Sequence, residues 1–296
     1  MAGPRLRAFR ERAIYRALVV ISAIGRRLPL RLGRFFGRRI GWLAFHVARR
    51  ERKKAIANIS IAFPEWSESQ RVATIMAMFR HFGMSLFEIA WLPNMDVALR
   101  DRLTVVEGAE PLLELMDAGR GVVVFTAHCG NWEWMSYAVG LFGRPTTVLQ
   151  RERSAPEMNR YITELRARSG VRTIDRGSAS AGRELIQSLR RGGILAFLID
   201  QNIRTENVKV PFFGRPAPTP IGPAKLAVRT ESIVVDILIE RLPDGRHRLK
   251  IGQPFAVSRD DDPVELTERM TRIIEAQVRR VPEQWVWVHD RWRDRK

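Results

Sequence analysis

The chain has 296 residues, an apolar fraction of 45% and a formal net charge of +18. This length suits one large α/β domain or two small ones, and the apolar fraction is too high for a disordered protein. The single cysteine, Cys129, excludes an intramolecular disulfide, which fits a reducing compartment.

Most of the excess charge lies in residues 1–54. This segment contains 16 Lys+Arg and 2 Asp+Glu, a balance of +14, so the other 242 residues carry only +4. A concentrated basic segment binds polyanions, either nucleic acid or an anionic membrane surface. Large apolar residues alternate with the arginines, and this favours basic amphipathic helices in a membrane interface over a nucleic-acid-binding arm. They are Ile14, Leu18, Val19, Val20, Ile21, Ile24, Leu28, Leu30, Leu32, Phe35, Phe36, Ile40, Trp42, Leu43 and Phe45.

No uncharged stretch is long enough to span a bilayer. The longest is Gly121–Trp132 with 12 residues, whereas a spanning helix needs about 20. The N-terminal runs 17–25 and 40–48 have nine residues each. We therefore expect a peripheral or monotopic protein that lies on the membrane. A signal peptide is not expected either, because arginines follow the first short apolar run directly.

The hydrophobic pattern changes along the chain and predicts two regions. Residues 1–92 are predicted to form a helical, basic, membrane-associating region, whose last helix ends before Pro93. Residues 93–296 are predicted to form an α/β domain, integrated with the first region into one catalytic unit. Its fold class is α/β, with a mixed, mostly parallel sheet flanked by helices. Strands are expected at 121–127, 146–149, 171–174 and 194–199, a hairpin at 233–241 and 247–251, helices at 132–141, 158–168, 179–191, 224–230 and 265–279, and a Gly/Pro-rich loop at 211–223.

The most informative stretch runs from Thr126 to Trp134. An apolar strand ends just before His128, a turn with a glycine follows, and the next helix carries Glu133 in its first turn. On an ideal helix a spacing of five places two side chains about 140° apart, so they converge only if His128 lies in the turn. Glu133 would then hold one imidazole nitrogen while the other accepts a proton from a substrate hydroxyl, and helix-start amides would stabilise an oxyanion. The alternative is a histidine that only packs or caps the turn.

Other candidate sites are weaker. Cys129 and His128 are neighbours in an extended segment and point in opposite directions, which disfavours a Cys–His pair. The sequence has no H-x-x-x-H, C-x-x-C, G-x-G-x-x-G or P-loop motif, so we expect neither a metal nor a nucleotide cofactor.

Asp200 follows the strand 194–199 and lies at the same sheet edge as His128. It either belongs to the site or only caps a turn. The proline-rich loop 210–220, with Arg215, either lines an acyl pocket or serves as a rigid crossover.

Four separated motifs resemble those of the bacterial late acyltransferases of lipid A biosynthesis, a branch of the lysophospholipid acyltransferase superfamily. They are T-A-H-C-G-N-W-E, D-Q-N, V-P-F-F-G-R-P-A-P-T-P-I-G-P-A-K-L-A and Q-W-V-W-V-H-D-R-W, within a similarity over about residues 10–295. The resemblance implies a fold like that of glycerol-3-phosphate acyltransferase. It also implies an acyl-carrier-protein donor and a membrane glycolipid acceptor, most of all a lipid A precursor. The expected location is the cytoplasmic face of the bacterial inner membrane, among anionic lipids.

The same resemblance implies roles for individual residues. The branch's H-x4-E motif falls on His128 and Glu133, which are therefore the expected catalytic pair. Arg166 and Asp200 are expected to bind substrate because they match functionally important positions of the family, and Arg151 because it matches a position that contacts substrate. Asn131, within the first motif, is also expected to bind substrate.

Two other functions remain open at this point. One is acylation of another glycolipid or a lysophospholipid, such as a phosphatidylinositol mannoside, although the H-x4-E motif argues mildly against it. The other is a non-catalytic protein that binds membrane or nucleic acid through residues 1–54. Pure nucleic-acid binding would weaken steeply with salt, whereas insertion into a membrane interface would keep an apolar component.

Overall fold

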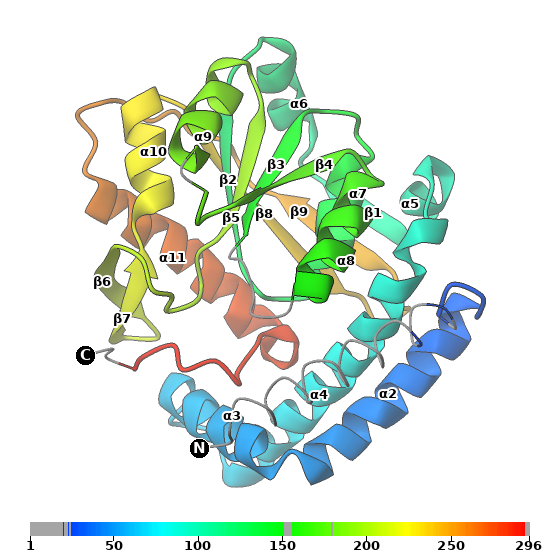
Figure 1. Ribbon diagram of the computed structural model, residues 1–296. Coiled ribbons are helices and arrows are strands. Elements are labelled where there is room, and N and C mark those ends of the chain that lie inside the picture. The colour runs from blue at the N-terminus through cyan, green and yellow to red at the C-terminus, as the bar shows by residue number, and fades with distance from the viewer. Residues whose placement is uncertain (1–19, 21–22, 24, 151–155, 179, 294–296) are drawn as a thin grey trace.

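A seven-stranded sheet lies at the centre of the molecule, with helices packed on both faces (Figure 1). The structure is a computed structural model that describes residues 20, 23, 25–150, 156–178 and 180–293. The strand order is β1-β9-β8-β2-β5-β3-β4, and every neighbouring pair is parallel except the antiparallel hairpin β8–β9. The strands are β1 (Thr104–Glu107), β2 (Val122–Thr126), β3 (Thr146–Gln150), β4 (Val171–Asp175), β5 (Ile194–Leu198), β8 (Ile233–Arg241) and β9 (His247–Ile251).

Each face of the sheet has its own hydrophobic core, because successive side chains of a strand point to opposite faces. From β2, Val123 and Phe125 belong to the core shared with α9, α10 and α11. Val122 and Val124 belong to the core shared with α6, α7 and α8. β2 is buried along its whole length and is the fourth of the seven strands. The residues after Thr126 therefore emerge at the middle of the sheet's carboxyl edge.

The later helices are α5 (Val97–Leu103), α6 (Glu110–Asp117), α7 (Trp132–Gly140), α8 (Pro156–Ala167), α9 (Ala181–Arg190), α10 (Gly222–Thr230) and α11 (Pro263–Arg280), with short 3-10 turns η1 (Leu92–Asn94) and η2 (Pro282–Gln284).

The helices α2 (Leu30–Val47), α3 (Arg49–Ala62) and α4 (Glu68–Trp91) lie together below the sheet in Figure 1. α4 begins with a capping box, in which Ser67 and Gln70 each bond the other's backbone N–H. α2 crosses α4 closely at glycines on both helices. A Cβ at Gly37 would stand 2.4 Å from the carbonyl oxygen of Gly83, which only a glycine avoids. By length and composition alone, 68–94 is the one helical segment of the described chain apolar enough to cross a bilayer.

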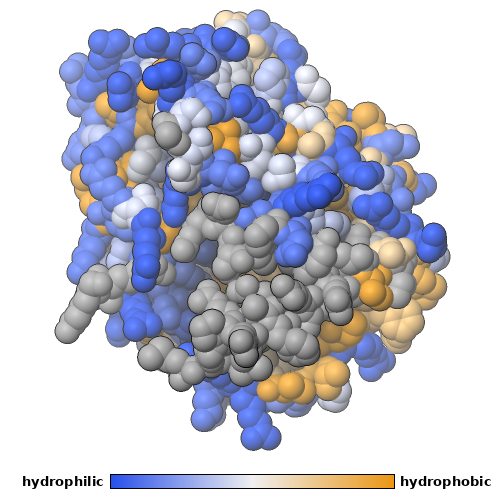
Figure 2. All heavy atoms as spheres, in the orientation of Figure 1, coloured by the Kyte–Doolittle hydropathy of each residue, from blue (hydrophilic) through white to orange (hydrophobic). Residues whose placement is uncertain are grey.

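The outward side of α2 carries large apolar side chains next to arginines. Figure 2 shows hydrophobic side chains gathered at the lower right, where α2 lies in Figure 1. This outer face of α2 consists of Leu32, Phe35, Phe36, Ile40, Leu43 and Val47, all more than two-fifths exposed. It agrees with the predicted amphipathic helix. The interfacial residues predicted at 14, 18, 19, 21 and 24 lie outside the described residues.

The predicted fold class is confirmed, and so are the predicted strands, the hairpin and the later helices. The loop predicted at 211–223 is wrong, because β6 (Asn207–Phe212) and β7 (Arg215–Pro220) pair as a separate antiparallel hairpin. Its prolines at 216, 218 and 220 occupy every second position, so the missing N–H groups share one edge of the strand. β1 was also not predicted. The predicted boundary between 1–92 and 93–296 falls one residue after the end of α4 and stays a prediction.

Candidate active site

The turn between β2 and α7 places His128 outside the helix, as the sequence predicted. Gly130 has a φ of 67°, and a Cβ there would stand 2.3 Å from the carbonyl oxygen of Ile239. Only glycine meets both conditions without strain. Asn131 then caps α7, because its side-chain oxygen accepts a hydrogen bond from the backbone N–H of Trp134 at 3.1 Å.

Asp200 holds the imidazole of His128. Its Oδ1 lies 2.8 Å from Nδ1 of His128, and its Oδ2 accepts the backbone N–H of His128 at 2.9 Å. Burial works to raise the pKa of Asp200. The electrostatic attraction of His128 and the hydrogen bonds that His128 and Trp285 donate outweigh the effect of burial, so the pKa of Asp200 lies below its usual value. An ionised carboxylate only accepts hydrogen bonds, so Nδ1 carries the ring proton and Nε2 is the basic nitrogen. Asp200 therefore contacts His128 directly, which makes it part of the candidate site and more than a turn cap.

Glu133 does not hold the imidazole, so that part of the sequence-based prediction is wrong. Both of its carboxylate oxygens accept hydrogen bonds from Arg166, at 2.7 and 2.9 Å. The same guanidinium donates to Oε1 of Gln150 at 3.1 Å. Glu133 is 4% and Arg166 6% exposed, so each charge is buried and needs the other. The fork of Arg166 matches a carboxylate in a way that one imidazole nitrogen cannot.

Asn131 lies behind the site. Its oxygen caps α7, and its side-chain N–H donates to Oε2 of Glu88 at 2.8 Å, so both ends of the amide are used within the protein. The residue is 2% exposed. A direct contact of Asn131 with substrate therefore stays a prediction that this geometry does not favour. Arg151, the other position expected to contact substrate, lies outside the described residues.

Glu88 on α4 is the centre of a buried polar cluster that the sequence did not reveal. Its carboxylate accepts hydrogen bonds from Arg34 and Arg241, each at 2.6 Å, and lies 3.2 Å from His247. Burial works to raise the pKa of Glu88, but Arg241 and His247 hold it well below its usual range. Burial lowers the pKa of His247 to about 4. The cluster thus joins α2, α4, the β8–β9 hairpin and the cap of α7.

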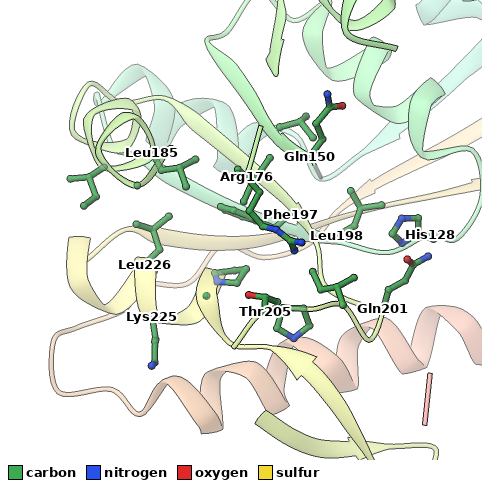
Figure 3. Close-up of a pocket in the computed structure, with 18 of the residues that line it drawn as sticks. His128, Gln150, Arg176, Leu185, Phe197, Leu198, Gln201, Thr205, Lys225 and Leu226 are labelled. Carbon is green, nitrogen blue, oxygen red and sulfur yellow. The ribbon is translucent and has the colours of Figure 1, made fainter. Parts of the chain in front are cut away.

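A cavity of about 560 Å³ opens beside His128 (Figure 3). In that view His128 lies at one end and Leu185 and Leu226 at the other, with Phe197 and Leu198 between them. Apolar lining residues come from β3, β5, α9 and α10. Four basic residues also line it, and no acidic residue is among its described lining residues. The basic residues are Arg166, Arg176, Lys225 and Arg229.

The proline-rich segment contributes little to this cavity. Pro220 lines it, but Arg215 is exposed on β7 and is not a lining residue. Phe212 and Phe213 instead pack against the rings of Trp285, Trp287 and Trp292. The segment is therefore mainly a hairpin that supports the C-terminal aromatic residues.

Cys129 points into the hydrophobic core, where it is 2% exposed. Burial raises the pKa of its thiol, and Asp200 adds to this effect. A thiol of this kind is a poor nucleophile. Among the described residues, no three His, Cys, Asp or Glu side chains are grouped so that they could hold a metal ion.

Comparison with known proteins gives the family. The model of the family described as bacterial lipid A biosynthesis acyltransferase matches residues 4–294. Similar proteins include a lipid A biosynthesis palmitoleoyltransferase of Escherichia coli (strain K12), 29% identical over 90% of this chain and 87% of the relative. A lipid A biosynthesis lauroyltransferase of the same strain is 28% identical, over 86% and 83%. A phosphatidylinositol mannoside acyltransferase of Mycobacterium tuberculosis (strain CDC 1551 / Oshkosh) is 30% identical over 52% and 50%. The chain belongs to the bacterial lipid A biosynthesis acyltransferase family.

Proposed function

We propose that this protein transfers a fatty acyl group to a hydroxyl of a lipid A precursor or a related membrane glycolipid, with acyl-carrier protein as the donor. One observation carries the proposal: the His128–Asp200 pair opens onto a long apolar cavity with basic residues on its wall. An acyl chain suits the apolar lining, and the basic residues suit phosphate groups of either substrate. Family membership and the names of the relatives support the acyl transfer.

The proposed reaction uses His128 as a general base. Its Nε2 takes the proton of the acceptor hydroxyl, and the oxygen attacks the carbonyl carbon of the thioester. The tetrahedral intermediate collapses, the C–S bond breaks, and the released thiolate takes the proton back from His128. Asp200 keeps the tautomer and stabilises the imidazolium that forms.

The helix start supplies donors for the oxyanion in this proposal. The first amide of α7 with a helical partner is that of Met135, which donates to the carbonyl oxygen of Asn131. The amides of Trp132 and Glu133 precede it and lie at the positive end of the helix. Trp132 also lines the cavity. Arg166 and Glu133 hold this helix start against α8, and in this proposal they position it.

The site of action is proposed to be the cytoplasmic face of the inner membrane. The outer face of α2 supports membrane contact, because apolar side chains there lie next to arginines that bind anionic lipid. The acidic donor protein would also be attracted by the net charge of +18.

The test is acyl transfer in mixed micelles from a panel of acyl-carrier-protein thioesters to a lipid A precursor. His128→Ala and Asp200→Asn are each expected to lower turnover by about 10²- to 10⁴-fold, because each removes the base or its orientation. Cys129→Ala is the matched control and is expected to stay within a few-fold of wild type. Loss of turnover in Cys129→Ala alone would contradict general-base catalysis by His128 and indicate a mechanism with Cys129 as the nucleophile.

A second acceptor belongs in the same assay. The partial match to phosphatidylinositol mannoside acyltransferases, over 50 to 60% of those relatives, makes such a mannoside the alternative acceptor. Transfer to the mannoside and not to the lipid A precursor would change the acceptor and leave the chemistry in place. Transfer to neither, with all donors, would contradict the proposed function.

A further inference from the structure

The C-terminal motif Q-W-V-W-V-H-D-R-W places the indole of Trp285 against the carboxylate of Asp200. Trp285 follows η2 and is 0% exposed. Its indole N–H donates to Oδ2 of Asp200 at 2.7 Å, the same oxygen that accepts the backbone N–H of His128. A β-bridge between Trp285 and Cys129 joins the two segments through their backbones. Trp285 is not among the cavity residues, so substrate in the cavity meets His128 and not the indole.

This contact has two physical effects on Asp200. It fixes the carboxylate plane, so that Oδ1 faces Nδ1 of His128 while Oδ2 is occupied by two donors. It also draws negative charge toward the indole, which weakens the attraction of the carboxylate for a proton on the imidazole. Loss of the donor would therefore strengthen the attraction between Asp200 and a protonated imidazole.

We propose that Trp285 is a positioning residue that acts through Asp200 and tunes the basicity of His128. The inference rests on the proposed function, because it takes His128 as the general base. Trp285 does not touch the reacting atoms. Its contribution is to fix the carboxylate of Asp200 against the imidazole of His128 and to take up part of the carboxylate's negative charge.

The other charged groups near the pair come from several elements. Arg291, fully buried in the C-terminal segment, acts electrostatically on Asp200. Cys129 is held as a neutral thiol. The cavity wall adds Arg166 with its partner Glu133, Arg176, Lys225 and Arg229. Glu240 and Glu283 act electrostatically on Cys129 beside the pair.

Trp287 offers a matched control two residues away. It is also 0% exposed and belongs to the same core, and its ring packs against that of Trp285 with centroids 4.6 Å apart. Its indole N–H donates at 2.6 Å to the backbone carbonyl of Pro282 instead of to a carboxylate. The two tryptophans thus differ mainly in the partner of the N–H.

The experiment replaces each indole, one at a time, by 3-benzothienylalanine, which keeps the ring shape and exchanges N–H for sulfur. The acid limb of kcat/KM against pH is expected to move upward by about 0.5 to 1 pH unit for position 285. No movement is expected for position 287. W285F and W287F provide the same comparison with natural side chains, although both leave a smaller ring in the core.

A second readout does not depend on acyl transfer. The pKa of His128 is measured by NMR on the full-length protein in micelles with labelled histidine, and the signal is assigned with the His128→Gln variant. The pKa is expected to rise with benzothienylalanine at 285 and to stay constant with it at 287. A rise without detectable transfer in wild type would keep this inference and contradict the proposed function. An unchanged pKa and acid limb at 285, or equal shifts at both positions, would overturn the inference.

Discussion

Two carboxylates near the end of β2 have different tasks. Asp200 holds the imidazole of His128, and Glu133 holds the guanidinium of Arg166. The spacing of His128 and Glu133 therefore reflects two linked positions at one helix start and not a direct hydrogen bond. The ion pair fixes α7 against α8, and Gln150 extends it to the end of β3.

Arg166→Lys tests this assignment at the residue scale. A lysine has a single ammonium in place of the planar fork, so it cannot reproduce the two parallel hydrogen bonds to Glu133 together with the one to Gln150. The free energy of unfolding is expected to fall by about 1 to 3 kcal/mol, and acyl transfer is expected to fall with it. The measurement is denaturant unfolding together with turnover in micelles.

Arg168→Lys is the control, since Arg168 is exposed near the same helix end. Equal effects of both substitutions would show that the fork geometry of Arg166 is unimportant.

Sequence reasoning predicted that His128 and Asp200 share one sheet edge, but not the hydrogen bonds of the candidate site. His128 and Asp200 follow apolar strands, and the carboxyl ends of parallel strands share one edge, so their proximity was predictable. The partner of the imidazole depended on the rotamer of Glu133 and on Arg166, 33 residues away, which no local pattern records. Glu88 stood alone in an apolar helix, and this was the available signal for a buried charge with partners.

At the scale of elements, glycine sets the distance between α2 and α4. Gly33, Gly37 and Gly41 recur every four residues on the buried face of α2, opposite Gly83. Arg34 on the same helix donates to Glu88, whose carboxylate also accepts from the cap of α7. Close packing of α2 therefore helps to place the helix start beside His128.

Gly37→Ala is expected to lower the free energy of unfolding by about 1 to 3 kcal/mol, because the new Cβ meets backbone that must shift. Gly182→Ala in α9 is the matched control, since no atom lies within 4 Å of its added Cβ. That control is expected to stabilise by about 0.5 to 1 kcal/mol through helix propensity. Denaturant unfolding of both variants in the same detergent measures the difference, and a neutral Gly37→Ala would contradict the close contact.

The elements themselves were largely predictable where their hydrophobic period was strong. β2, β5 and the hairpin β8–β9 are apolar runs, and α11 has a regular amphipathic pattern. β6 and β7 escaped prediction because their prolines argue against strands, and only the paired register shows that the missing donors lie on one edge. β1 has four residues and pairs with β9 across a separation of more than 140 residues, so local sequence gave it little support.

At the scale of the whole molecule, charge and apolar surface gather in the N-terminal region. The outer face of α2 is half-exposed and apolar, and basic residues at 49–54 follow it on α3. The combination is typical of a protein that inserts one helix face between lipid head groups.

The double variant Phe36→Glu/Ile40→Glu is expected to lower binding to vesicles of anionic lipid by at least about tenfold, because two exposed apolar side chains that would insert into the lipid become charged. Flotation of the purified protein with vesicles at low and high salt measures it. Val264→Glu on α11 is the control, since Val264 is an exposed apolar residue far from this helix in the chain. Binding by the double variant at the wild-type level in high salt would show that the outer face of α2 does not insert.

The buried thiol of Cys129 makes the natural chain behave as a cysteine-free background under native conditions. It is the single cysteine of the sequence, it is 2% exposed, and burial raises its pKa, so reagents in solution meet almost no thiolate. Probes attached to newly introduced surface cysteines would then label one position only. Because Cys129 directly follows the proposed general base, its own slow reaction with a thiol reagent would report how often the turn between β2 and α7 opens.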